Sequence, residues 1–447
     1  FGWSPAAGAQ INLPTSNTVW TSKDTELTPD HPVELIWDNG EGLIFHRIIS
    51  IDQNYMFTVE QKVENKSGAT ITLYPYGLIS RHGTPKTAHY YILHEGPIGI
   101  FNDTLEETDY SDLEKGENAS YGSTGGWIGF TGKFWLTALI PDQKSKIKGR
   151  FSFATPGVRY QTDYVNQDGV TVASGETASI SNRFFAGAKE VELIDSYEEK
   201  LGIPKFDLAI DWGWFYFLTR PIYFALHFLA GYIGNLGIAI MCLTVVIKLL
   251  LFPLAHKSYV SMSKMKRLQP EMVKLREQYS DDKQKLNQEM MALYKREKAN
   301  PAAGCLPILL QVPIFFALYK VLFVTLLMRH QPFFGWIHDL SAPDPTTVFN
   351  LFGLIPWDPP QILMIGALPI LMGISMFLQQ RLNPQPADPI QAKIFTFMPI
   401  FFTYLLAHFP AGLVIYWTWN NMLSMTQQWI IMKRMGVSPA GGKEKKA

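Results

Sequence analysis

The sequence predicts a protein of two parts, an N-terminal all-β sandwich followed by an α-helical membrane bundle with a helical hairpin after its first span. Three observations predict this class. Short alternating apolar runs, separated by Gly, Asn and Asp, fill residues 1–204, with no strong helical periodicity before Glu190. Apolar runs of roughly the 20 residues that a bilayer requires fill much of the remainder. The charge divides in the same way. Residues 1–200 hold 26 acids and 16 bases, whereas residues 201–447 hold 13 acids and 23 bases.

We expect residues 1–204 to form the β-sandwich domain, with strands such as Tyr55–Val63 and Val170–Ala173. An envelope enzyme or sugar-binding protein anchored by its helices is one alternative. It requires an acid/base pair in this domain, and no histidine there has a carboxylate or nucleophile at a suitable spacing. Cys242 and Cys305 lie in apolar runs, and no Cys/His spacing is typical of a metal site. We therefore expect no cofactor, no metal and no enzymatic activity.

The segments that flank the first span carry the information on topology. Residues 205–234 are unusually aromatic and are interrupted by Arg220-Pro221, which favours a helix lying on the membrane surface over a sixth span. The first residues, FGWSPAAG, do not have the charged and then apolar pattern of a signal or anchor, and we expect the natural chain to be longer at its N-terminus.

Five predicted transmembrane helices follow, at 235–256, 301–328, 361–380, 390–408 and 412–432. They are joined by a charged hairpin at 257–300 and a loop at 329–360, and they end in a basic tail at 433–447. Bases concentrate in the hairpin, in the turn at 381–393 and in the tail. The positive-inside rule therefore places these three segments in the cytoplasm and the β-sandwich outside it.

The hairpin carries one apolar stripe on each of its predicted helices. Met262, Met265, Leu268 and Met272 recur at spacings of three and four, and Leu286, Met290 and Leu293 repeat the pattern, so two antiparallel helices should pack through these faces. Residues 255–300 hold eleven bases against six acids. The hairpin either only joins two spans or forms a docking surface for a partner or for anionic lipid. The candidate docking bases are Lys264, Lys266, Arg267, Lys274 and Arg276.

Lys248 is the one formal charge inside the first predicted span, with Thr244 one helical turn before it. A charge at that depth usually faces a protein interior or a water-filled cavity, although a lysine stem can also snorkel toward the interface. Gln311, Tyr416 and Asn420 are polar groups in other spans. Each is tolerable as an interhelical hydrogen bond, but the predicted spans offer Lys248 no acidic partner, which favours a wet groove.

Several stretches resemble a known family. They are DDKQKLNQEMMALYKREKANP at 281–301, GCLPILLQVPIFFALY at 304–319, FFGWIHDLSAPDP at 333–345 and FPAGLVIYWTWNN at 409–421. They are similar to the YidC/Oxa family of membrane-protein insertases in its Gram-negative form. STGGWIGFTGKFWLTALIP at 123–141 resembles a stretch of that family's periplasmic β-supersandwich.

The resemblance implies a multi-pass insertase and foldase of the bacterial inner membrane, with its β domain in the periplasm and its C-terminus in the cytoplasm. Its partners would be nascent membrane proteins, the ribosome, the Sec translocon, membrane lipid and, as a further possibility, the signal-recognition-particle receptor, but no specific nucleic acid. The family places a base, usually Arg, in a groove open to cytoplasm and lipid, and the matching position here is Lys248. The implied groove residues are Lys248, Thr244, Gln311, Tyr416 and Asn420, and a substrate's apolar segment would slide along Val312, Pro313, Tyr404 and Leu405.

A transporter or channel subunit that uses Lys248 as the counter-charge of its substrate is the competing function. It predicts inverted repeats and a discontinuous helix. The sequence shows no pairing of halves, although Pro313 leaves room for a broken helix.

Overall fold

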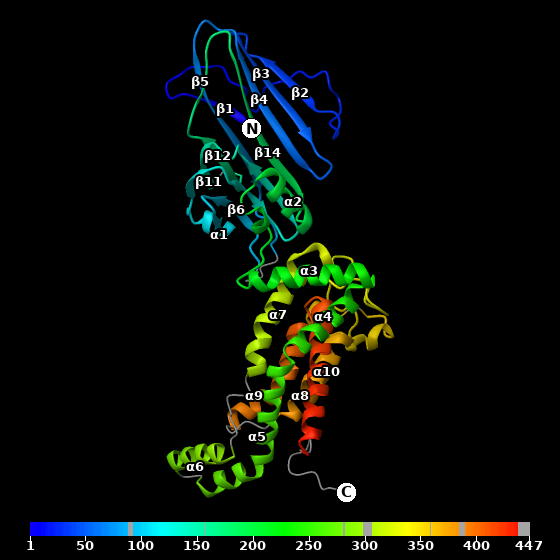
Figure 1. The fold of residues 1–447 in the computed structure, drawn as a ribbon. Helices are drawn as coiled ribbons and strands as arrows, with labels where there is room; N and C mark the ends of the chain where they lie inside the picture. Colours follow the sequence, from blue (N-terminus) through cyan, green and yellow to red (C-terminus); the bar gives the residue numbers. More distant parts are fainter. Residues whose placement is uncertain are drawn as a thin grey trace. The chain divides into compact units, whose positions relative to one another are not determined.

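The computed structural model describes residues 1–87, 93–155, 157–279, 282–297, 306–357, 359–383 and 389–436. The chain divides into two compact units. The β unit comprises Phe1–Asp211 together with Val324–Leu326, and the helical unit comprises Trp212–Phe323 and Leu327–Ala447. Figure 1 shows the fold.

Two antiparallel sheets make up the β unit, as the alternating runs predict for a sandwich. In one sheet the strands follow the order β1-β5-β12-β11-β8, with β13 paired to β5, and in the other the order is β2-β3-β4-β14-β10-β9-β6-β7. The strands are β1 Gly2–Pro5, β2 Val33–Asp38, β3 Leu43–Ile51, β4 Met56–Asn65, β5 Ile71–His82, β6 Gly96–Phe101, β7 Thr104–Glu107, β8 Ala119–Thr124, β9 Trp127–Thr131, β10 Trp135–Ile140, β11 Lys146–Ala154, β12 Arg159–Asn166, β13 Val170–Val172 and β14 Thr177–Ala188. Three short helices accompany them: α1 Tyr110–Glu114, α2 Val191–Leu201 and the 3₁₀ helix η1 Phe206–Ala209.

The core of the β unit is aromatic and comes entirely from this unit. Trp127 of β9 packs edge-on against Phe206, and Phe185 of β14 contacts both Tyr197 and Phe206. Helix α2 and η1 therefore close one end of this cluster with side chains that are fully or almost fully buried. All three apolar clusters of the unit use residues numbered below 212, so the unit has a hydrophobic core of its own.

The helical unit contains eight α-helices among the described residues, joined by short 3₁₀ turns. The helices are α3 Tyr216–Ile233, α4 Leu236–Leu250, α5 Phe252–Gln278, α6 Lys283–Arg296, α7 Leu306–Val324, α8 Ala367–Leu382, α9 Pro389–Leu406 and α10 Ala411–Arg434. The 3₁₀ turns are η3 Leu326–Met328, η4 Val348–Gly353 and η5 Gln361–Leu363. Helix α10 lies against α4, α5 and α8, and it is the central element of the bundle (Figure 1).

Helix α4 is shorter than the span that we predict at 235–256. It ends at Leu250, and α5 begins at Phe252 at an angle of 71° to it. Pro253 stands in the first turn of α5, where its missing N–H is harmless, whereas inside a continuous helix its ring would clash with the carbonyl of Leu249. The chain therefore bends just after Lys248, and α5 runs on into the segment that we assign to the hairpin.

Helices α5 and α6 pack through the two predicted stripes, with Leu268, Met272, Met290 and Leu293 buried between them. Arg296 and Glu271 add an exposed ion pair at 2.9 Å.

Among the described residues, the only candidate for a membrane crossing by length and apolar composition is the bent pair α4 and α5, and no single helix qualifies. The predicted tail overlaps the described residues only at 433–436; residues 437–447 lie outside them.

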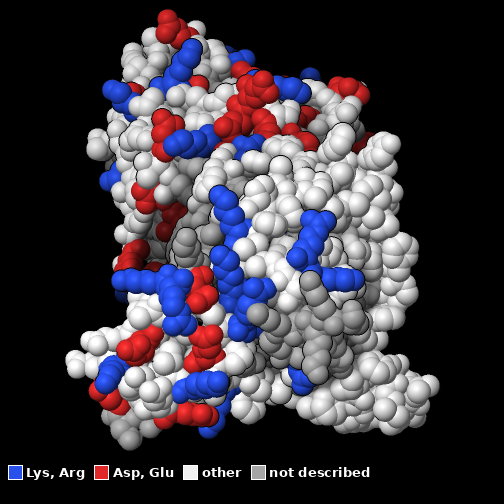
Figure 2. All heavy atoms as spheres, turned by 60° about the horizontal axis from the view of Figure 1, so that its bottom comes forward, with Lys and Arg blue, Asp and Glu red and all other residues white. Residues whose placement is uncertain are grey.

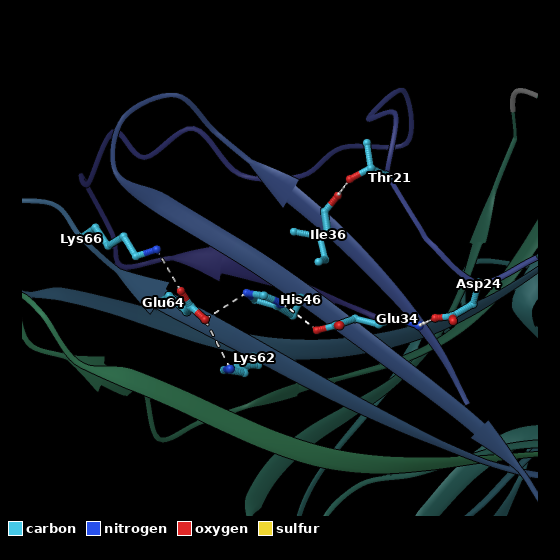
Figure 3. Close-up of polar contacts among 8 residues, drawn as sticks. All are labelled: Thr21, Asp24, Glu34, Ile36, His46, Lys62, Glu64 and Lys66. Atoms are coloured by element: carbon cyan, nitrogen blue, oxygen red, sulfur yellow. Dashed lines mark hydrogen bonds and ion pairs between the residues drawn. The ribbon is translucent and has the colours of Figure 1, made fainter. Parts of the chain in front are cut away.

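A charged cluster lies on the outer strands of the eight-stranded sheet (Figure 3). His46 of β3 stands between two carboxylates, with its Nδ1 2.8 Å from Glu34 Oε1 and its Nε2 3.3 Å from Glu64 Oε1. Lys62 and Lys66 approach the two Glu64 oxygens at 3.3 and 3.2 Å. The hydrogen bonds from these lysines, that of Lys66 above all, hold the pKa of the Glu64 carboxyl below its usual range.

Replacing Glu64 by Gln should therefore destabilise the β unit in a pH-dependent way. Because the pKa of Glu64 is lower in the folded than in the unfolded state, its stabilisation is present above the unfolded pKa and is lost as the pH falls through the folded pKa. We expect a loss of up to about 1 kcal/mol in the free energy of unfolding at pH 7, the range for exposed ion pairs, and a smaller difference in acid. Denaturant unfolding of residues 1–211 at several pH values measures it. Glu41→Gln, in the exposed turn between β2 and β3, is the matched control, and an equal effect of both variants at all pH values would contradict the prediction.

Candidate functional site

Lys248 lies in the last turn of α4 and points into the helical unit. Its Nζ donates a hydrogen bond to Ser424 Oγ of α10 at 2.8 Å and lies 3.5 Å from Gln311 Oε1 of α7. Gln311 continues the network, because its Nε2 donates to Tyr416 Oη at 2.5 Å. Ser424 Oγ in turn donates to the carbonyl oxygen of Asn420 at 2.8 Å. Three helices that are distant in the sequence thus meet in one polar cluster.

The polar cluster depends on a repeat of four residues along α10. Tyr416, Asn420, Ser424 and Gln428 lie one helical turn apart, so they share a face, and all four are buried. Ser424 and Gln428 are not among the groove residues predicted from the sequence. The spacing of four residues between Tyr416 and Asn420, continued along the helix, leads to both. Gln428 Nε2 donates to Leu382 O and to Asn383 Oδ1, each at 3.1 Å. The same face of α10 therefore holds the end of α8 as well as the lysine.

The other predicted groove residues lie close to this cluster but use their polar groups differently. Thr244, one turn before Lys248, is buried and donates to the carbonyl oxygen of Ile240 in its own helix at 2.7 Å. Asn420 is buried, and its Oδ1 accepts no hydrogen bond from any described residue. An orphaned acceptor of this kind is paired with water or with a ligand in most proteins.

The electrostatic character of the cluster follows from these contacts. An ammonium group has three N–H donors, and the described residues offer the Lys248 ammonium two neutral acceptors and no carboxylate. Its side chain is half-buried, and the third N–H donor is left without a partner among the described residues. The cluster can therefore attract an anionic group without first breaking an ion pair.

The four predicted slide residues lie on two helices beside the cluster. Val312 of α7 and Tyr404 and Leu405 of α9 expose much of their side chains, and Pro313 is partly buried. Phe315 of α7 and Phe402 of α9 both contact Trp417 of α10, with ring centroids 4.6 and 5.7 Å apart. The two outward-facing apolar surfaces are thus attached to the same helix that carries the polar face.

The predicted docking bases divide into exposed and occupied groups. Lys274 is exposed, and Lys264 and Arg276 are partly exposed. Arg267 donates to Met435 O at the end of α10 at 2.6 Å. Lys266 is only 4% exposed, and its Nζ donates to Arg381 O and Leu382 O at 2.9 and 3.1 Å. Burial lowers the pKa of the Lys266 ammonium. Figure 2, which looks onto this end of the helical unit, shows many Lys and Arg side chains with acids among them.

An apolar pocket of about 410 Å³ shares no lining residue with the polar cluster. Residues of α4, the aromatic pair Phe333 and Phe334, and Trp419 of α10 line it. Its lining offers no hydrogen-bonding group for a polar chain. The polar cluster, which brings several hydrogen-bonding side chains together, is therefore the better candidate for a functional site.

Comparisons with known proteins decide the family. The 60Kd inner membrane protein family matches residues 228–438, and the YidC periplasmic domain family matches residues 1–225. The membrane protein insertase YidC of Beijerinckia indica subsp. indica is 55% identical over 446 residues, which cover 98% of this chain and 74% of that protein. The chain belongs to the YidC family of membrane protein insertases. It accordingly combines a periplasmic domain with an inner-membrane portion.

A second relative agrees with this assignment. The membrane protein insertase YidC of Methylobacterium radiotolerans is 54% identical over 449 residues, covering 98% of this chain and 72% of that protein. Among solved structures, an active YidC insertase with its first transmembrane domain resolved aligns at a TM-score of 0.41 and 19% identity, covering 88% of this chain and 75% of the other.

Replacing Lys266 by Met should destabilise the helical unit. The change keeps an apolar stem of similar length but removes the hydrogen bonds to Arg381 O and Leu382 O at the end of α8. Among the described residues, Gln428 still donates to Leu382 O, and no side chain replaces the donor to Arg381 O. A hydrogen bond from a charged donor contributes about 1.5–3 kcal/mol. Thermal unfolding of the purified protein in detergent measures the effect, with the exposed Lys274→Met as control. Equal unfolding temperatures for the two variants would show that the Lys266 contacts contribute nothing.

Proposed function

We propose that the polar cluster around Lys248 lines a hydrated groove through which a polar tail or loop of a newly made membrane protein passes on its way across the inner membrane. The observation that carries the proposal is a half-buried base whose partners among the described residues, Ser424 and Gln311, are both neutral. Such a base attracts an acidic group of a substrate, and it survives among apolar helices where water reaches it. The orphaned Asn420 Oδ1 offers an acceptor to the amide groups of the same substrate.

The proposed mechanism lowers the free-energy barrier for moving polar groups across lipid and involves no covalent chemistry. An acidic residue of the substrate tail is first drawn to Lys248. The membrane potential, positive outside, then favours outward movement of a negative charge by roughly 2.3 kcal/mol per 100 mV. The substrate's apolar segment leaves sideways along Val312, Pro313, Tyr404 and Leu405, driven by burial of its surface in lipid at about 25 cal/mol per Å².

The proposed topology has five spans with the β unit in the periplasm. The first span is α4 continued by the start of α5, and the others are α7, α8, α9 and α10. Helix α3 lies at the periplasmic interface, where its exposed Phe217, Phe228 and Tyr232, and Trp214 just before it, suit the boundary between lipid and water. The bases of α5 and α6 and those at the end of α10 are then cytoplasmic, in agreement with the positive-inside rule.

The α5–α6 hairpin is the proposed docking surface for the ribosome and the nascent chain, with the Sec translocon and the signal-recognition-particle receptor as further partners. The proposal rests on the bases that remain accessible, chiefly Lys274 together with Lys264 and Arg276. Lys266 contributes differently, because it holds the end of α8 and so links the hairpin to the helix bundle.

The bend between α4 and α5 also supports a second candidate, a transporter or channel subunit. A discontinuous helix beside a charged residue is typical of transporter substrate sites, and Lys248 stands three residues before the break at Leu251. The two functions differ in their substrates. A transporter moves a small solute and needs no nascent protein, whereas an insertase places a nascent protein in the membrane.

Replacing Lys248 by Ala should impair insertion of substrates that carry an acidic residue in the translocated tail. Two unit charges 4 Å apart attract each other by about 1 kcal/mol even in bulk water, so we expect at least a roughly fivefold lower insertion rate. Lys248→Arg should retain most of the activity, because the charge is kept. Protease protection of a substrate in proteoliposomes measures insertion, and a substrate with Asn in place of the acid is the control. Wild-type rates for the acidic substrate with Lys248→Ala would refute the electrostatic step.

A further inference from the structure

The loop between α7 and α8 presents a compact apolar surface that no described residue covers. Six large apolar side chains of residues 349–357 are exposed: Phe349, Leu351, Phe352, Leu354, Ile355 and Trp357. Leu354 is 84% exposed. Residues 346–357 contain no charged side chain. So dense an apolar surface is unfavourable in water and typically marks a membrane or protein contact.

We call residues 348–357 the apolar tip. Its backbone is held in a defined conformation by polar side chains of the same loop. Thr347 Oγ1 accepts from Phe349 N at 3.3 Å and donates to Leu363 O at 2.9 Å. Asn350 Oδ1 accepts from Gly353 N at 2.9 Å, and the Asn350 carbonyl accepts from Ile355 N at 3.0 Å. Between them, Leu351 and Phe352 adopt φ angles of 51° and 59°, which non-glycine residues rarely do. The outward direction of the apolar side chains is thus built into the turn.

The tip is rooted at the end of the helical unit where α8 and α10 begin. Asp344, which is buried, accepts hydrogen bonds from Leu368 N of α8 at 2.8 Å and from Thr346 N at 3.0 Å. Gly412 N of α10 donates to Leu340 O at 3.0 Å. Phe333 of the same loop lies against Gly237, in the first turn of α4 and directly after α3. The tip, the exposed aromatic face of α3 and the starts of three helices therefore belong to one end of the unit (Figure 1).

We propose that residues 348–357 insert their apolar side chains into the headgroup–acyl boundary of the periplasmic leaflet, as a second interfacial anchor beside α3. The inference rests on the proposed membrane placement of the helices. Lipid is the occupant that fits, because the tip is aromatic and aliphatic, uncharged, and joined directly to the ends of helices that enter the bilayer. The tip thereby fixes the depth of α8 and α10 while a substrate passes between the helices.

A fluorescence experiment on the whole chain tests the anchor. In a Cys242→Ser, Cys305→Ser background, single cysteines replace Leu354, Gln331 and Ile400, and each is labelled with an environment-sensitive dye in phospholipid nanodiscs. Gln331 is an exposed polar residue of the same loop, and Ile400 is an exposed side chain of α9 that lies in a proposed span. We expect a lipid that carries a spin label near its headgroup to quench the dye at Leu354, a lipid with a deeper spin label to quench the dye at Ile400, and neither to quench the dye at Gln331.

Each other outcome overturns a distinct statement. If the dye at Ile400 is quenched but the dye at Leu354 is in water, the loop anchor is wrong and the proposed function stands. If the dye at Leu354 is shielded from water yet insensitive to both spin-labelled lipids, a protein surface, such as a second copy of this chain, covers the tip and the lipid proposal is wrong. If neither dye responds to lipid, the membrane placement on which both proposals rest is wrong.

Discussion

The interaction on which the helical unit depends is the hydrogen bond from Lys248 to Ser424. A lysine among apolar helices must find acceptors within reach, and the described residues supply them from two other helices, α10 and α7. Because the partners are neutral, the positive charge is held in place but not neutralised. The contact that stabilises the lysine inside the bundle therefore leaves its positive charge uncompensated, and in the proposed function this charge attracts the substrate.

The polar face of α10 links this site to the end of the unit that carries the α5–α6 hairpin. Its first four turns carry the cluster, and Gln428 then contacts the end of α8, where Lys266 of α5 donates to the same carbonyl of Leu382. Helix α5 also begins just after Lys248. In the proposed function, a partner that moved the hairpin would therefore act through direct contacts on α4 and α10, the helices that hold Lys248 and Ser424.

Much of the fold follows from patterns that are local in the sequence. Alternating apolar residues predict the sandwich, long apolar runs predict the helices, and two Met/Leu stripes predict the packed hairpin. Three residues of the site, Lys248, Gln311 and Tyr416, can be recognised as polar groups in apolar runs. The bend at Leu251 does not follow, because α5, α7 and α9 all continue through prolines at Pro270, Pro313 and Pro399. Nor does the role of Lys266, since its acceptors lie 115 and 116 residues away and nothing local distinguishes it from the other bases.

The most direct test of the groove is site-specific photocrosslinking to a ribosome-bound nascent membrane protein from positions 248, 311 and 416. A chain that passes through the cluster should crosslink from all three positions, and the crosslinks should disappear once the substrate is released into lipid. Crosslinks confined to the α5–α6 hairpin, with none from these three positions, would contradict the groove. Lys248 would then have only a structural role, as a hydrogen-bond donor to Ser424 and Gln311 within the bundle.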